Sequence, residues 1–120
     1  MQSYQELKVW QQAMDLAELS YRITKAFPKQ ETYGMISQIR RSAVSVPANI
    51  AEGYGRKSRK QYLQFLYYSQ GSLKELETHF LLCVRVELAS SQTITPALDL
   101  CGSVGRLLFL LIRALEKGSN

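Results

Sequence analysis

The chain has 120 residues, of which 46% are hydrophobic and 21% are charged, and its formal net charge is +5 at pH 7. This length suits one globular domain, and the hydrophobic and charged fractions exclude a disordered chain. Seven glycines and three prolines are too few for a collagen-like chain. No apolar run reaches the ~20 residues that span a bilayer, and the first residues lack the pattern of a signal peptide. We therefore expect a single domain over residues 1–120 that is cytoplasmic and has no membrane partner.

Apolar residues recur at steps of three and four along the chain, which is the spacing of amphipathic helices. The first predicted helix covers about residues 4–26 and ends before Pro28. Its predicted apolar face consists of Leu7, Trp10, Ala13, Met14, Ala17, Tyr21 and Phe27.

The second predicted helix covers about residues 33–53, and Pro47 lies inside its apolar pattern. A proline lacks the N–H that would bond to the carbonyl of Ala43, so we expect a kink there. The alternative is a helix that stops near Ser45 and restarts at Pro47. One kinked helix is favoured because the apolar phase continues through Ile50.

Capping patterns mark the third and fourth predicted helices. Ser58 followed by Gln61 resembles a capping box and starts a helix over about residues 58–88. Thr95 followed by Pro96 resembles a cap and first helical residue, and starts a helix over about residues 96–116. Four amphipathic helices with short links predict an all-α, up-down-up-down antiparallel four-helix bundle.

Residues that carry catalysis or hold metals are scarce. His79 is the single histidine, and its spacing of four from Glu75 suits a side-chain pair better than a metal centre. Cys83 and Cys101 lie among apolar or small residues, and we interpret them as reduced, buried thiols. The sequence therefore predicts no enzyme, no catalytic residue, no cofactor and no metal.

Small polar residues follow one side of the second and third predicted helices, away from the apolar faces. A solvated helix face usually carries Lys and Glu, whereas Ser and Asn are mediocre helix formers. Two interpretations stay open, namely exposure to solvent or contact with another subunit, and the tyrosines of the third helix favour contact. The candidate interface residues are Gln38, Ser42, Ser45, Asn49, Tyr68, Ser72 and Glu75.

Positive charge is concentrated between residues 40 and 60, where six basic residues accompany one acid, Glu52. Such a cluster beside Tyr54 and Tyr62 indicates a surface that binds phosphates and stacks on bases. The other interpretation is a solvated loop whose charge keeps the protein soluble. The candidate nucleic-acid contacts are Arg40, Arg41, Arg56, Lys57, Arg59 and Lys60.

Arg40 and Arg41 have a second interpretation of their own. They lie within the second predicted helix, beside an antiparallel neighbour that carries Glu75 and Glu77. A structural role as ion pairs with these two acids is therefore an alternative to phosphate binding.

Three strings of residues in the second and third predicted helices are specific enough to suggest a family. They are Gln-Ile-Arg-Arg at 38–41, Ser-Val-Pro-Ala-Asn-Ile-Ala-Glu-Gly at 45–53 and Gly-Ser-Leu-Lys-Glu-Leu-Glu at 71–77. They closely resemble the four-helix-bundle family first associated with intervening sequences of the 23S ribosomal RNA gene, also labelled S23 ribosomal proteins. The same fold family includes the accessory variability proteins of diversity-generating retroelements. The resemblance covers about residues 4–88.

The resemblance implies a ring-like homopentamer with a positively charged surface proposed to bind nucleic acid. In the retroelement members the bundle associates with a reverse transcriptase and template RNA, and the family has no catalytic residues to carry over. Our hypothesis from the sequence is a non-enzymatic oligomer that binds structured RNA or DNA through repeated basic patches. The alternative is a homo-oligomeric protein-interaction scaffold, for example a reverse-transcriptase accessory factor, with no direct nucleic-acid role.

Overall fold

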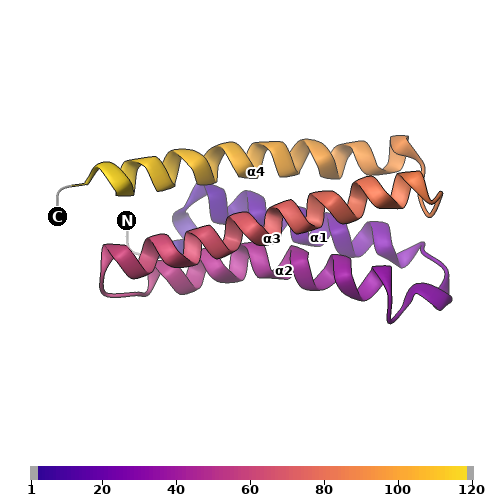
Figure 1. The fold of residues 1–120 in the computed structure, drawn as a ribbon, viewed down its shortest axis with the longest axis horizontal. Helices are drawn as coiled ribbons and strands as arrows, with labels where there is room; N and C mark the ends of the chain where they lie inside the picture. The colour runs from indigo at the N-terminus through magenta and orange to yellow at the C-terminus, as the bar shows by residue number, and fades with distance from the viewer. Residues whose placement is uncertain (1–2, 119–120) are drawn as a thin grey trace.

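The computed structural model describes residues 3–118 as four long helices with no strand in that range. Two short 3-10 turns, η1 (Tyr4–Glu6) and η2 (Lys29–Glu31), precede the first and second helices. Consecutive helices run in opposite directions in a body of 49 × 22 × 20 Å (Figure 1), which confirms the predicted all-α, up-down-up-down bundle. The helices are α1 (Lys8–Lys25), α2 (Met35–Tyr54), α3 (Arg59–Arg85) and α4 (Ser91–Lys117).

Each helix packs against two neighbours, so the four form a closed ring in cross-section. α2 lies against α1 and α3, and α4 lies against α3 and α1, whereas the diagonal pairs make no close backbone contact within residues 3–118. α2 and α3 share the most extensive contact. This α2–α3 seam positions most of the candidate site residues, because they lie on these two helices and on the turn that joins them.

α1 buries a face that differs from the predicted one by part of a turn. Leu16 and Ile23 are buried, whereas Met14 and Tyr21, which we expected on the apolar face, are 44% and 42% exposed. The apolar residues of this helix cover a wide band, so their spacing alone does not decide which edge of the band faces the core. As a result, the Tyr21 ring lies at the surface beside α2.

α2 continues through Pro47 as one helix, so the alternative of a break near Ser45 is wrong. Pro47 is buried, and the neighbouring carbonyl of Val46 accepts a hydrogen bond at 2.8 Å from the buried hydroxyl of Ser69 on α3. α3 therefore supports the α2 backbone directly beside the proline.

α3 begins where expected and ends earlier. The Ser58 hydroxyl accepts a hydrogen bond from the N–H of Gln61 at 3.1 Å, which is the N-cap half of the predicted capping box. At the other end, Glu87 adopts a left-handed φ of 62°, and the N–H of Leu88 donates to the carbonyl of Cys83 at 2.9 Å. This Schellman ending stops the helix three residues before the predicted boundary at 88 and turns Glu87 away from the core.

The start of α4 corrects a prediction. We expected Thr95 to be the N-cap, but the cap is Ser90, whose hydroxyl accepts a hydrogen bond from the N–H of Thr93 at 3.1 Å. Pro96 therefore lies inside the helix, in its second turn. Both serine and threonine satisfy the capping rules, and tertiary packing decides between them, because the longer helix buries Ile94 completely.

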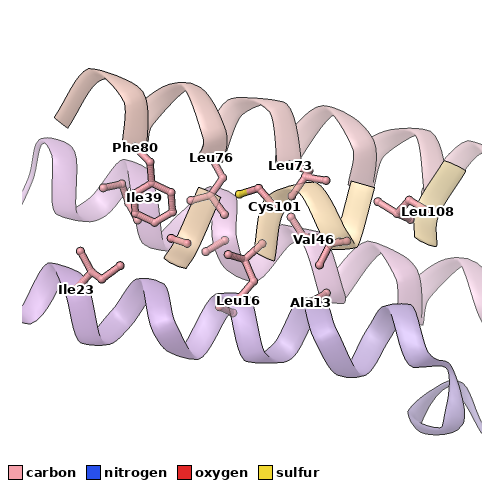
Figure 2. Close-up of a cluster of buried hydrophobic side chains, with 14 of the residues drawn as sticks. Ala13, Leu16, Ile23, Ile39, Val46, Leu73, Leu76, Phe80, Cys101 and Leu108 are labelled. Atoms are coloured by element: carbon pink, nitrogen blue, oxygen red, sulfur yellow. The ribbon is translucent and has the colours of Figure 1, made fainter. Parts of the chain in front are cut away.

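The core runs along the axis of the bundle and receives side chains from every helix (Figure 2). Leu16, Ile39, Leu76, Phe80 and Leu108 are all fully buried there. Burial of one such side chain contributes roughly 1.5–3 kcal/mol to the free energy of unfolding. Within residues 3–118, every buried side-chain nitrogen or oxygen has a hydrogen-bond partner, so this core carries no unsatisfied polar group.

Candidate nucleic-acid interface

The six candidate phosphate contacts do not form one patch, which corrects the impression that their sequence proximity gives. Arg40 and Arg41 lie in the second turn of α2, whereas the other four lie after Tyr54, the last residue of that helix. At a rise of 1.5 Å per residue, these two groups are separated by about 20 Å along α2. The structure therefore divides the predicted basic surface into two sites.

Arg40 is held in place by α1. Its Nε donates to the hydroxyl of Thr24 at 2.9 Å, and one Nη donates to the carbonyl of Tyr21 at 3.4 Å. The guanidinium carbon also lies 4.5 Å from the centroid of the Tyr21 ring. A guanidinium has five N–H donors, so three remain for another group once these two bonds are made.

Within residues 3–118 neither Arg40 nor Arg41 forms an ion pair with Glu75 or Glu77, so the ion-pair alternative is wrong. Glu75 and Glu77 each pair with a residue of their own helix, α3. Arg41 is exposed and donates to the side-chain oxygen of Gln38 at 3.4 Å. Neither arginine is therefore needed to neutralise α3.

The second group of cations forms what we call the basic end of the bundle. The turn from α2 to α3 and the end of α4 lie side by side there (Figure 1). A Cβ built on Gly118 would approach the guanidinium of Arg59 within 2.6 Å, so the end of α4 lies against the start of α3. The basic end consists of Arg56, Lys57, Arg59, Lys60 and Lys117.

The cations of the basic end differ in the contacts that they make within the chain. Arg56 forms an ion pair with Glu52 at 2.5 Å, and its guanidinium carbon lies 4.6 Å from the centroid of the Phe65 ring. Lys57 and Lys60 are exposed and form no ion pair within residues 3–118. These two lysines are therefore better placed than Arg56 to meet an external phosphate.

Most of the small polar residues of the predicted interface lie in the α2–α3 seam. Ser42 is only 3% exposed, which corrects its placement on a surface face. The hydroxyls of Ser45 and Ser72 lie 2.8 Å apart, and the Asn49 amide donates to the carbonyl of Ser45 at 2.8 Å. These hydrogen bonds within one chain satisfy the side chains of Ser45, Asn49 and Ser72, which the sequence pattern had suggested as contacts with a second subunit. Small side chains suit the seam because α2 and α3 approach closely, as the crowding around Gly53 also shows.

The other predicted interface residues, Gln38, Tyr68 and Glu75, are exposed. Tyr68 packs edge-to-face against Phe65 at a centroid distance of 5.5 Å. Glu75 lies 3.4 Å from His79, which matches the side-chain pair that their spacing indicates. A subunit contact through these exposed residues stays a prediction.

A groove between α3 and α4 exposes apolar side chains that we had not singled out. It has a volume of about 780 Å³, and Phe109 and Leu110 on its wall are 51% and 61% exposed. Glycines at positions 71, 102 and 105 also line it. The signal in the sequence was the run Leu107–Ile112, which is apolar at six consecutive positions and so exceeds what one helix face can bury.

The two cysteines are buried and form no disulfide. Burial raises the pKa of the Cys83 thiol to about 11 and that of the Cys101 thiol to about 12, so both remain protonated at neutral pH. Within residues 3–118, no group of three or more His, Cys, Asp or Glu residues could hold a metal ion. In the same range, no helix combines the length and the apolar character that crossing a membrane requires.

Comparisons with known proteins agree with this architecture. A solved structure from Bacteroides thetaiotaomicron, described as a protein with unknown function from the S23 ribosomal protein family, has a TM-score of 0.79 and 23% identity. The alignment covers 88% of this chain and 98% of that one, so the two share a fold. A search of curated proteins gives no match. The family model described as "23S rRNA-intervening sequence protein" matches residues 5–109, and the chain therefore belongs to that family.

Proposed function

We propose that this protein is a non-enzymatic oligomer that binds RNA or DNA through the basic end of each subunit. The observation that carries the proposal is the pair Lys57 and Lys60, two exposed cations without an ion-pair partner in the described chain. Arg59 and Lys117 add positive charge at the same end. Membership of a family described by a 23S rRNA intervening sequence supports a role beside nucleic acid.

Several copies of the basic end in one oligomer would bind a nucleic acid more tightly than a single copy does. A few lysines at one site supply little affinity at physiological salt, because each one only replaces a condensed counterion on the phosphate backbone. Linked copies convert later binding steps into intramolecular events, and the overall affinity then exceeds that of one copy by orders of magnitude. The ring-like homopentamer implied by the family resemblance is the assembly that we propose.

The test removes the two lysines and compares them with two exposed cations of α3 that lie outside the basic end. The double variant Lys57→Ala with Lys60→Ala should weaken binding to a labelled structured RNA and to a DNA duplex alike. The slope of log affinity against log salt should fall by about one unit for each phosphate that the variant no longer neutralises. The control double variant, Lys74→Ala with Arg85→Ala, carries the same change in net charge on exposed positions of α3 outside the basic end.

Two outcomes would contradict the proposal. The first is the absence of binding by the unaltered protein even at low salt. The second is an equal loss of affinity in both double variants, which would mean that affinity follows the net charge and not the basic end. Circular dichroism of each variant checks that the helices remain folded.

The groove between α3 and α4 favours a second candidate function, a protein-interaction scaffold. Its exposed Phe109 and Leu110 suit contact with an apolar surface, which is typical of the core of a protein interface. The surface would join subunits or seat a client such as a reverse transcriptase. Leu110→Glu should lower the mass in solution or abolish client binding, while the helices stay folded because this side chain is 61% exposed. An unchanged mass together with unchanged client binding would contradict a role for this groove.

A further inference from the structure

A groove formed by α1, α2 and the link between them combines positive charge with exposed aromatic rings, whereas Tyr54 and Tyr62 beside the basic end are half-buried and pack against one another. It has a volume of about 640 Å³ and lies in the half of the bundle that contains Arg40 and Arg41. Its lining joins guanidinium groups with exposed aromatic and apolar side chains. The lining residues are Tyr21, Thr32, Tyr33, Ile36, Ser37, Arg40, Arg41, Val44 and Ser45.

The positive charge of this α1–α2 groove favours an anionic ligand. Two arginines line it and no carboxylate does. Glu31, the acid nearest to it in sequence, accepts a hydrogen bond from the N–H of Met35 at 3.2 Å and so serves the start of α2. Arg40 is already fixed by its bonds to α1, so it loses little side-chain freedom when its remaining donors bind a phosphate.

The aromatic side chains of the groove favour a ligand with an exposed planar group that can stack on them. Tyr33 is 96% exposed, so its ring has no packing role within the described chain. Tyr21 and Val44 are 42% and 44% exposed and extend the apolar surface along the groove. Bases of unpaired nucleotides stack on such rings, whereas the bases of a duplex are already stacked on one another.

The shape of the groove suits a chain more than a single small molecule. Its α2 residues recur at every turn from Ile36 to Ser45, with Tyr33 just before the helix. The stretch from Ile36 to Ser45 corresponds to about 14 Å along the helix. Arginines in the middle and a tyrosine at one end therefore follow one another along a line.

We propose that the α1–α2 groove binds unpaired nucleotides of a single-stranded RNA or DNA segment. A base stacks on the ring of Tyr33, and the neighbouring phosphate meets the guanidinium groups of Arg40 and Arg41. This inference rests on the proposed function and adds to it a preference for single strands. The basic end, about 20 Å from Arg41 along α2, then binds the phosphate backbone of a single strand or of a duplex.

The experiment measures the binding of three labelled probes by fluorescence anisotropy at low salt. The probes are an oligothymidylate of about ten nucleotides, a duplex of the same length, and an oligoglutamate peptide that carries charge without bases. The variants are Tyr33→Ala, Tyr33→Phe and Arg41→Ala, since these side chains are exposed and their removal spares the core. Arg85→Ala, an exposed arginine on α3 away from the groove, is the matched control for Arg41→Ala, and Tyr33→Phe is the control for loss of the Tyr33 ring.

Tyr33→Ala should weaken binding of the oligothymidylate by about 5- to 150-fold, the decrease that removal of one stacking ring produces. Tyr33→Phe should retain that binding because the ring remains. Arg41→Ala should weaken it and lower its salt slope by about one unit. Binding of the duplex should stay unchanged in the Tyr33 variants, and Arg85→Ala should bind every probe like the unaltered protein.

Each failure identifies which idea is wrong. If Tyr33→Ala binds the oligothymidylate normally while Lys57→Ala with Lys60→Ala weakens the binding of both nucleic acids, the groove proposal is wrong and the proposed function is supported. If Tyr33→Ala loses the single strand while the lysine variant binds normally, the groove stands and the basic end is wrong. Tight binding of oligoglutamate that depends on Arg41 but not on Tyr33 would overturn the groove proposal in favour of an acidic protein partner. Absence of binding to either nucleic acid would overturn both.

Discussion

Replacement of Gly53 by alanine tests how closely α2 and α3 approach. A methyl group at this position would lie 2.9 Å from the Cβ of Phe65 and 3.1 Å from the carbonyl oxygen of Tyr62. Neither atom is the end of a flexible side chain, so relief requires the two helices to move apart. The seam that they form holds the Ser45–Ser72 hydrogen bond, and separation would strain it as well.

The size of the effect follows from two opposed terms. Overpacking of a tight contact costs about 1–3 kcal/mol of the free energy of unfolding. Alanine regains at most about 1 kcal/mol over glycine in a helix, and less here because Gly53 lies in the last turn of α2. We therefore expect Gly53→Ala to lower the free energy of unfolding by about 1–2 kcal/mol.

Gly71 provides a matched control, because the same chemical change there meets no obstacle. This glycine lies in the middle of α3, and a Cβ built on it has no neighbour within 4 Å. Gly71→Ala should therefore raise the free energy of unfolding by up to about 1 kcal/mol. The two variants should move in opposite directions.

Urea unfolding followed by far-ultraviolet circular dichroism measures both variants. The protein concentration must be the same throughout, because assembly would make the apparent stability depend on it. The dependence of the free energy on urea should keep its slope, so a change in midpoint reports stability. Gly53→Ala with a stability equal to that of the unaltered protein would refute the close approach of the two helices.

Two further predictions concern the end of α3 and the buried thiols. Glu87→Gly should raise the free energy of unfolding by about 0.5–1 kcal/mol, because Glu87 has a φ of 62°, a conformation that glycine adopts without the steric penalty of a Cβ. A lower urea midpoint for this variant would contradict the prediction. Cys83 and Cys101 should resist alkylation at neutral pH while the protein is folded and react once urea unfolds it, so rapid labelling of the folded chain would contradict their burial. Because burial raises their pKa from 9.0 to about 11 and 12, their contribution to stability should be complete below pH 9 and decline as the pH rises from there through about 11 to 12, which unfolding at graded pH measures.

The sequence by itself determined the helices, since both their spacing and their caps are local properties. A helix is held by bonds between residues four apart, so a continuous apolar phase was enough to carry α2 through Pro47. Ser58 and Gln61 marked the start of α3 for the same reason. Local rules failed in two places. Ser90 and not Thr95 caps α4, because the longer helix buries Ile94, and α3 ends at Arg85 because Glu87 adopts a left-handed φ.

Only the tertiary structure decided what surrounds each residue of the candidate sites. The rotation of α1 about its axis left the Tyr21 ring at the surface beneath Arg40. The approach of α3 placed the Ser72 hydroxyl 2.8 Å from that of Ser45, so the two residues satisfy one another within the chain. The length of α2 separated Arg41 from Lys57, although the two are close in sequence. Such placements depend on which side chains of distant segments fit together, whereas helical periodicity records only the neighbours along one helix.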